Sequence, residues 1–276
     1  MSIKVPMQRT ELNITDLCNR KCNICPRAWG YPNQDLHMET ETAEVIFKTT
    51  AEYTNYVSLA GRGEPLLCKN FLEILELSVK YKKHIHIITN ADILDKFIDD
   101  IHSLINLNEV NMGSGKHKMM INSYDGEEQK KERIEKWGHF KGLDFPDPKI
   151  FNANDHHSTK KLVNRGGVLP WGKPEVIEKP CFILFHRGYF NWNGDVGLCC
   201  NNWEDIKSFG NIHDRPFKEI WEGDEMMLWR EKLSIKNGRQ SFKQCIECDA
   251  AQEWSEQKQN YRDFVKGKIQ KFDYFK

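Results

Sequence analysis

Nine cysteines are the residues of this sequence best suited to chemistry, and most of them fall into two groups. Cys18, Cys22 and Cys25 lie within eight residues near the start, whereas five others lie in the last hundred residues. Nine cysteines cannot all pair as disulfides, and clustered thiols in a reducing compartment are more often metal ligands. The two groups therefore predict two metal sites.

The first group has the spacing Cys-x3-Cys-x2-Cys in a predicted loop. Three thiolates on one short loop can hold three irons of a four-iron cluster and leave the fourth iron open to a non-protein ligand. A structural zinc site would instead need four ligands in a closed tetrahedron. The next histidine, His37, lies twelve residues beyond Cys25, which is too far for a compact zinc finger. Zinc is kept as the alternative at this site.

Four cysteines of the second group have the layout of a four-thiolate site: Cys181, Cys199, Cys245 and Cys248. We expect the first two on the strands of a hairpin that turns at Asn193-Gly194, followed by a Cys-x-x-Cys pair. Cys200 is adjacent to Cys199, but neighbours on a strand point to opposite faces, so only one can face a metal. The Gly194-x4-Cys199 spacing favours Cys199. Zinc ribbons share this pattern, so zinc is again an alternative.

Alternating strands and helices must position the first group. Short apolar or β-branched segments bounded by turn residues predict four strands: Glu11–Thr15, Tyr56–Ala60, His84–Asn90 and Lys149–Asn154. Apolar residues at helical spacing predict the helices between them: Thr40–Tyr53, Asn70–Tyr81 and Ile93–Leu104. A further strand is either Glu109–Gly113 or, as we favour, Met119–Tyr124, with a helix at Glu127–Trp137. This alternation predicts an α/β fold with a parallel sheet that binds ligands at the carboxyl ends of its strands.

The pattern changes after Gly166-Gly167. The hairpin, a helix over Phe217–Leu233 and the terminal cysteine pair predict a small module of about ninety residues, whose thin core metal ligation would supplement. We therefore expect two domains, residues 1–168 and 169–276.

The composition excludes several classes of protein. Lys plus Arg equals Asp plus Glu at 40 each, so the overall charge predicts no nucleic-acid partner. The mean hydropathy of -0.67 and the lack of a long apolar run predict no membrane span. The N-terminus lacks the features of a signal peptide, so we expect a cytoplasmic protein.

The first cysteine loop, LNITDLCNRKCNICP over residues 12–26, resembles that of the radical S-adenosylmethionine (SAM) superfamily. The resemblance implies a partial (β/α)6 TIM-like barrel in which SAM binds the open iron. It also implies that the reduced cluster cleaves SAM to methionine and a 5′-deoxyadenosyl radical, which takes a hydrogen atom from the substrate. One departure is Ile24, where the family usually has an aromatic residue near the adenine.

Further segments resemble the SAM-binding elements of the family. Residues 60–65, AGRGEP, are similar to its Gly-Gly-Glu-Pro segment, which implies that Gly63 and Glu64 contact the methionyl amino group. Arg62 replaces the first glycine. Asn90 matches a position that contacts the SAM ribose, although a turn residue would equally fit there. Ser123, at the end of the next predicted strand, completes the predicted SAM-binding set.

The C-terminal module resembles the SPASM/twitch extension of radical SAM enzymes. The shared features are the Cys…Gly-x4-Cys segment, Gly210-Asn211-Ile212 before a helix with Ile220-Trp221, and the terminal cysteine pair. A full SPASM domain has more cysteines, so the resemblance implies the twitch form with one fully ligated four-iron cluster. Full thiolate ligation suits electron transfer. Two 4Fe-4S clusters and SAM are thus the expected cofactors.

GEPLLCKN at 63–70 and NRGG at 164–167 resemble segments of twitch-type radical SAM dehydrogenases that oxidise a hydroxyl of an aminocyclitol. That resemblance implies that Arg165 contacts the substrate. Because arginine is normally protonated, we expect it to stabilise a departing alkoxide; the alternative is that it only clamps a glycine turn.

The resulting expectation is a radical SAM oxidoreductase that acts on a sugar or aminocyclitol and receives electrons from a flavodoxin or ferredoxin type protein. The first alternative is a maturase that cross-links or epimerises a ribosomally made peptide. Only about ten residues precede the first predicted strand, so we expect no fused leader-peptide-binding domain. A zinc-binding protein without catalytic activity is the remaining alternative.

Overall fold

The computed structural model describes residues 5, 7–108, 117–148, 163–170, 177–203 and 207–250 of the chain. Its strands form one sheet in the order β5-β4-β3-β2-β1-β6-β7-β8. The strands are β1 (Arg9–Leu12), β2 (Tyr56–Leu59), β3 (His84–Thr89), β4 (Lys118–Ile121), β5 (Leu143–Asp144), β6 (Arg187–Phe190), β7 (Asp195–Gly197) and β8 (Ser208–Asn211). The run from β5 through β1 to β6 is parallel, and β7 and β8 are antiparallel additions.

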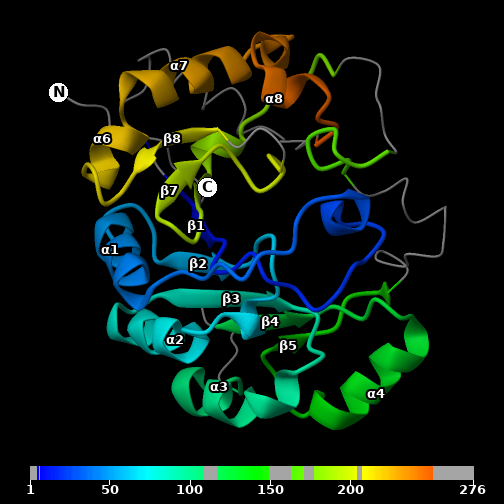
Figure 1. The fold of residues 1–276 in the computed structure, drawn as a ribbon. Helices are drawn as coiled ribbons and strands as arrows, with labels where there is room; N and C mark the ends of the chain where they lie inside the picture. Colours follow the sequence, from blue (N-terminus) through cyan, green and yellow to red (C-terminus); the bar gives the residue numbers. More distant parts are fainter. Residues whose placement is uncertain are drawn as a thin grey trace.

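Helices cover the outer face of the parallel strands (Figure 1). They are α1 (Thr40–Thr50), α2 (Phe71–Lys80), α3 (Ile98–Ile105) and α4 (Glu127–Trp137), with the short 3-10 helices η1 (Pro26–Trp29), η2 (Pro65–Leu67) and η3 (Leu94–Lys96) in the connections. Parallel neighbours require such crossovers, which confirms the predicted α/β class. A second group lies over β7 and β8: η5 (Ile183–Phe185), α6 (Phe217–Trp221), α7 (Asp224–Leu233), η6 (Gly238–Ser241) and α8 (Lys243–Ile246).

Alternation along the strands separates an apolar outer face from a polar inner face. Leu59, Ile87 and Ile121 are almost fully buried and belong to the continuous hydrophobic core. Ser58 and His86, which are in register on β2 and β3, occupy the alternate positions. Because successive side chains point to opposite faces, the sheet encloses a polar interior on the side away from the helices.

Most predicted elements of the N-terminal part are confirmed. The helix over Glu127–Trp137 has the predicted bounds, and the favoured Met119–Tyr124 strand corresponds to β4. The predicted helix Ile93–Leu104 is wrong in one respect, because it is divided at Phe97 into η3 and α3. The two-residue strand β5 was not predicted. The Lys149–Asn154 and Glu109–Gly113 segments lie outside the described residues.

The C-terminal part differs from its prediction in two ways. The single helix over Phe217–Leu233 is wrong, because Gly223 separates α6 from α7. A Cβ at this glycine would lie 2.3 Å from the Glu219 carbonyl oxygen, so the turn between the two helices requires a residue without a side chain. The hairpin at Asn193-Gly194 is confirmed, but its first strand β6 pairs in parallel with β1. One sheet therefore joins the two predicted domains.

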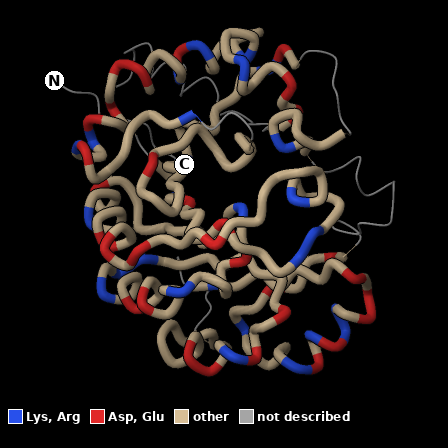
Figure 2. Tube along the Cα trace, viewed as in Figure 1, with Lys and Arg blue, Asp and Glu red and all other residues tan. Residues whose placement is uncertain are grey.

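Charged residues of both signs are interspersed along the outer helices (Figure 2). α4 is the most polar of them, with only Arg133 and Trp137 buried. Among the described helices, none combines the length and apolarity needed to cross a membrane.

Candidate functional site

The three-cysteine loop follows β1 at the carboxyl edge of the parallel strands. Asn33 ties the loop to a later segment, because its Oδ1 accepts from the Cys18 amide (2.9 Å) and its Nδ2 donates to the Cys18 carbonyl (3.1 Å). The Cys25 amide donates to the Cys22 carbonyl at 2.9 Å, which curls the loop before η1. Burial raises the pKa of Cys18 and raises that of Cys22 to about 12. The Cys18 and Cys22 thiols are therefore protonated at neutral pH, and ligation to a cation must drive their ionisation.

The predicted SAM-binding segment packs directly on this loop. The Glu64 amide donates to the Leu17 carbonyl at 2.8 Å. A Cβ at Gly63 would lie 2.3 Å from the Thr15 carbonyl oxygen and 2.5 Å from that of Leu17, so only glycine permits this approach. Gly63 and Glu64 thus lie against the loop, as their predicted role requires.

The Glu64 carboxylate is buried and joins the ends of β2 and β3. It accepts hydrogen bonds from the Thr89 hydroxyl, the Asn90 amide (2.7 Å) and the Leu66 amide (3.2 Å). Burial raises the Glu64 pKa to about 7, and these three donors oppose the shift. Asn90 in turn donates from Nδ2 to Asn19 Oδ1 at 2.8 Å. The structure therefore brings Glu64 and Asn90 together beside the cysteine loop.

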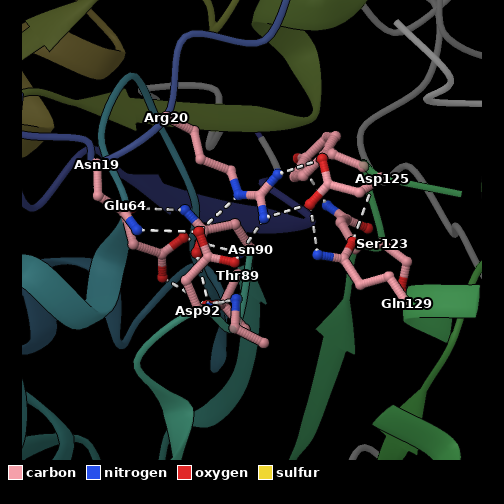
Figure 3. A network of polar contacts seen from close by, with 12 residues as sticks. Asn19, Arg20, Glu64, Thr89, Asn90, Asp92, Ser123, Asp125 and Gln129 are labelled. Atoms are coloured by element: carbon pink, nitrogen blue, oxygen red, sulfur yellow. Dashed lines mark hydrogen bonds and ion pairs between the residues drawn. The ribbon is translucent and has the colours of Figure 1, made fainter. Parts of the chain in front are cut away.

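Arg20, within the cysteine loop, forms a double fork that the sequence analysis missed (Figure 3). Its guanidinium donates to both Asp92 oxygens at 2.6 and 2.7 Å and to both Asp125 oxygens at 3.0 and 2.8 Å. These carboxylates raise the Arg20 pKa. Asp92 and Asp125 follow β3 and β4, so one side chain ties the loop to two strand ends. Their positions just after predicted strands were the available signal.

Ser123 lies at the same edge but does not contact the Glu64 group directly. It is buried, and the Arg133 guanidinium reaches its hydroxyl at 3.5 Å while donating to the Asn122 carbonyl at 2.6 Å. Arg133 also pairs with Asp92 at 3.0 Å. Ser123 is thus connected to Arg20 through Arg133 and Asp92.

The four cysteines of the second group line one pocket, together with apolar residues and Arg239. Its lining includes Cys181, Cys199, Cys245 and Cys248. Cys181 precedes η5 and Cys199 follows β7, so the prediction that both lie on hairpin strands is wrong. Both lie in irregular segments that lead into and out of the hairpin. Burial raises the pKa of Cys199 and Cys248, and that of Cys245 to about 12.

Cys200 is not among the residues that line this pocket. Burial raises its pKa to about 12; Glu11 also raises it, whereas Arg165 and Arg187 lower it. Cys200 therefore faces groups of the barrel side, although it is not on a strand as the prediction assumed. This arrangement supports Cys199 as the proposed ligand.

Arg165 lies beside the cysteine pocket and close enough to Cys200 to lower the pKa of that thiol, on which Glu11 of β1 also acts. Its Nη1 donates to Asn201 Oδ1 at 3.3 Å, and it has a left-handed φ of 52°. The next residue, Gly166, lines the pocket, and a Cβ there would lie 2.5 Å from the Asn201 carbonyl oxygen. The NRGG turn is therefore fitted closely against the segment that carries Cys199 and Cys200.

A buried polar group at the inner face of β1 and β6 was also missed. Glu11 pairs through Oε1 with Arg187 at 2.8 Å, and its buried Oε2 has no hydrogen-bond partner among the residues that the structure describes. Tyr189, in register with Glu11, has a buried hydroxyl that likewise has no partner. Two unsatisfied polar atoms beside Cys200 are what a polar ligand would satisfy. A charged residue at the first position of the predicted strand Glu11–Thr15 was the available signal.

Both donor sets fit iron–sulfur clusters. The first offers three thiols on one loop, and the second offers four thiols in a largely apolar pocket, as thiolate-held clusters require. Within the described ranges, no three His, Cys, Asp or Glu side chains converge on a position for a single metal ion.

Comparison with known families agrees with this arrangement. Residues 12–114 match the Radical SAM superfamily, and residues 181–249 match SPASM, described as an iron-sulfur cluster-binding domain. The chain therefore carries a radical SAM domain and a SPASM-type domain. The first domain therefore binds SAM and a 4Fe-4S cluster, and the second binds additional iron–sulfur. These matches favour iron–sulfur over the zinc alternatives.

Two curated relatives are similar to the chain. The S-adenosyl-L-methionine-dependent 2-deoxy-scyllo-inosamine dehydrogenase of Niallia circulans is 25% identical over 91% of this chain and 96% of its own length. A probable GTP 3′,8-cyclase of Methanocaldococcus jannaschii is 32% identical, but over only 37% of this chain and 34% of its own length. The first similarity extends over both cysteine sites and identifies an oxidoreductase of the radical SAM type.

Solved structures show the same fold. BtrN in complex with AdoMet and 2-DOIA superposes with a TM-score of 0.72 at 23% identity, covering 91% of this chain and 96% of that chain. Streptococcus suis SuiB bound to precursor peptide SuiA superposes with a TM-score of 0.58 at 11% identity, covering 81% of this chain and 66% of that chain. The predicted barrel with a C-terminal twitch module is thereby confirmed as a fold.

Proposed function

We propose that this radical SAM enzyme oxidises a hydroxyl group of a small polar molecule, an aminocyclitol or a sugar, to a ketone. The observation that carries the proposal is the position of Arg165, which lies beside the four-cysteine pocket and acts on Cys200 together with Glu11 of β1. Such an oxidation needs a group at the reacting oxygen and an electron acceptor nearby. The relative that acts on 2-deoxy-scyllo-inosamine supports this substrate class.

The proposed ligand roles follow the geometry of the two cysteine groups. Cys18, Cys22 and Cys25 would hold the catalytic cluster, and Cys181, Cys199, Cys245 and Cys248 would hold one auxiliary cluster in the twitch form. Gly63, Glu64, Asn90 and Ser123 would contact SAM at the carboxyl ends of β2, β3 and β4. When bound, these groups supply a hydrogen-atom acceptor at the first site and a one-electron acceptor at the second.

The chain's own residues would bind and orient the substrate. The Glu11 carboxylate and the Tyr189 hydroxyl can hydrogen-bond hydroxyl or amino groups inside the barrel. The Arg165 guanidinium can stabilise negative charge on the carbinol oxygen as its proton leaves. In total the substrate loses one hydrogen atom from carbon, one proton from oxygen and one electron, and becomes a ketone.

A peptide substrate is the second candidate, favoured by the shared fold of the peptide-bound SuiB structure. The buried polar atoms of Glu11 and Tyr189 argue for a compact ligand, because they lie deep in the sheet interior. A flavodoxin or ferredoxin type reductant and a cytoplasmic location remain part of the proposal.

The test is an anaerobic screen of the reconstituted chain for stimulated 5′-deoxyadenosine release. We expect 2-deoxy-scyllo-inosamine or a related aminocyclitol or sugar to stimulate release and to yield one ketone per SAM cleaved. Deuterium at the carbinol carbon should appear in 5′-deoxyadenosine. Stimulation by peptides alone, with none by polyols or aminocyclitols, would contradict the proposal.

A further inference from the structure

Arg239 is a buried cation at the wall of the four-cysteine pocket. It lies in η6 and is only 2% exposed. Of the described residues that line the pocket, it is the one with a permanent charge. A buried cation is costly unless an opposite charge lies close to it.

The guanidinium of Arg239 is held rigidly by backbone oxygens. Nε donates to the Lys179 carbonyl (3.1 Å), Nη1 to the Cys248 carbonyl (3.1 Å) and Nη2 to the Ala250 carbonyl (2.7 Å). These bonds bring together the segments on both sides of the pocket. They fix the charge next to the cysteine pair without neutralising it.

No carboxylate in the described part of the chain lies within ion-pair distance, 4.0 Å, of this guanidinium. Asp249 is affected by Arg239 at longer range but is hydrogen-bonded to Asn164. The charge of Arg239 therefore lies at the pocket wall beside Cys248, and no carboxylate of the described residues pairs with it.

We propose that Arg239 is the counter-cation of the auxiliary iron–sulfur site and raises its reduction potential, which makes the site a better electron acceptor. Four thiolates on a four-iron core leave a net negative charge, which becomes more negative on reduction. A fixed cation stabilises the reduced form more than the oxidised form. The inference rests on the proposed function only in assigning the electron of the substrate to this site.

The experiment measures the midpoint potential of the auxiliary cluster without substrate. A full-length chain in which Cys18, Cys22 and Cys25 are alanine retains only the auxiliary signal, which EPR can follow during a redox titration. In that background we expect Arg239→Gln to reduce the equilibrium constant for one-electron reduction at least tenfold, a shift of about 59 mV to lower potential. Arg239→Lys, which keeps the charge, should restore most of the potential.

Arg230 provides a matched control. It is 0% exposed, donates from Nε to the Leu184 carbonyl at 3.0 Å and lies 4.0 Å over the Trp221 ring. It is not among the pocket residues. We expect Arg230→Gln to lower thermal stability but to leave the potential unchanged.

Two results would overturn the proposal. One is an unchanged potential in Arg239→Gln with full iron content. If that variant fails to hold iron, Gln244→Glu adds a negative charge to the same pocket and should lower the potential, so no shift there is the second overturning result. Because no substrate is involved, failure here leaves the hydroxyl-oxidation proposal untouched.

Discussion

Asn164 and Asp249 exchange two hydrogen bonds across the boundary between the NRGG turn and the terminal cysteine pair. The Asn164 amide donates to Asp249 Oδ1 at 2.6 Å, and the Asp249 amide donates to Asn164 Oδ1 at 3.2 Å. Asn164 Nδ2 also donates to the Glu247 carbonyl at 2.6 Å. The turn that carries Arg165 is therefore attached to the segment that carries Cys245 and Cys248, and the two are positioned as a unit.

Arg165→Lys should uncouple SAM cleavage from substrate oxidation. Lysine keeps the charge but cannot reproduce the planar fork that reaches Asn201, so stabilisation of the departing alkoxide is lost. We expect ketone formation to fall about 100-fold, as for loss of one oxyanion donor. 5′-Deoxyadenosine release should persist because the first site is unchanged. If Arg165→Lys gives an unaltered ketone yield, Arg165 does not act on the substrate and only holds the glycine turn in place.

Arg20→Ala should loosen the first cysteine loop. The substitution removes four hydrogen bonds to Asp92 and Asp125, and we expect it to cost about 1–3 kcal/mol of stability. The first cluster should then lose iron to a chelator several-fold faster. Arg20→Lys should recover only part of the lost stability and iron retention, because an ammonium cannot make paired hydrogen bonds to two carboxylates at once.

The control for this prediction is Lys131→Ala, which breaks an exposed ion pair with Glu128. Such pairs contribute under about 1 kcal/mol. If both variants lose iron at the wild-type rate, Arg20 does not hold the loop.

The sequence predicted what depends on local pattern. Apolar residues at helical spacing gave α2, and short apolar or β-branched segments bounded by turn residues gave β2 and β3, because these signals lie within each segment. The parallel pairing of β1 with β6, in which Arg9 lies opposite Arg187, was missed. These strands are far apart in the sequence, and their register depends on tertiary packing that no local pattern records. The division at Gly223 was missed because a single glycine does not by itself end a periodic pattern.

The site was predictable to the same extent. Cysteine spacing indicated both thiol groups, through the Cys-x3-Cys-x2-Cys run of the first and the terminal Cys-x-x-Cys pair of the second. The Arg20 fork joins residues 72 and 105 positions apart, so no local pattern contains it. Arg239 is one of 40 basic residues, and only its burial beside four thiols distinguishes it.

Replacing the two cysteine groups separately should separate SAM cleavage, which needs the first group, from the auxiliary cluster, which needs the second. Cys18→Ala with Cys22→Ala and Cys25→Ala should reduce iron from about eight to about four per chain and abolish SAM cleavage. Cys181→Ala with Cys245→Ala and Cys248→Ala should lose the same amount of iron but keep SAM cleavage. Cys200→Ala should keep all of the iron, because Cys200 does not line the pocket. Loss of the auxiliary signal in Cys200→Ala, but not in Cys199→Ala, would reverse the ligand assignment.

The raised pKa of Glu64 predicts a pH-dependent stability. Below pH 4.5 this carboxyl is protonated in both folded and unfolded chains, and its favourable contribution is complete. Between pH 4.5 and about 7 the unfolded chain ionises first, so the contribution of roughly 3 kcal/mol is lost as pH rises. Glu64→Gln should remove this slope in urea unfolding of the metal-free chain, compared at pH 5 and pH 7.5. Glu76→Gln, at an exposed position of α2, should keep it. A slope that survives in Glu64→Gln would assign the dependence to another buried group.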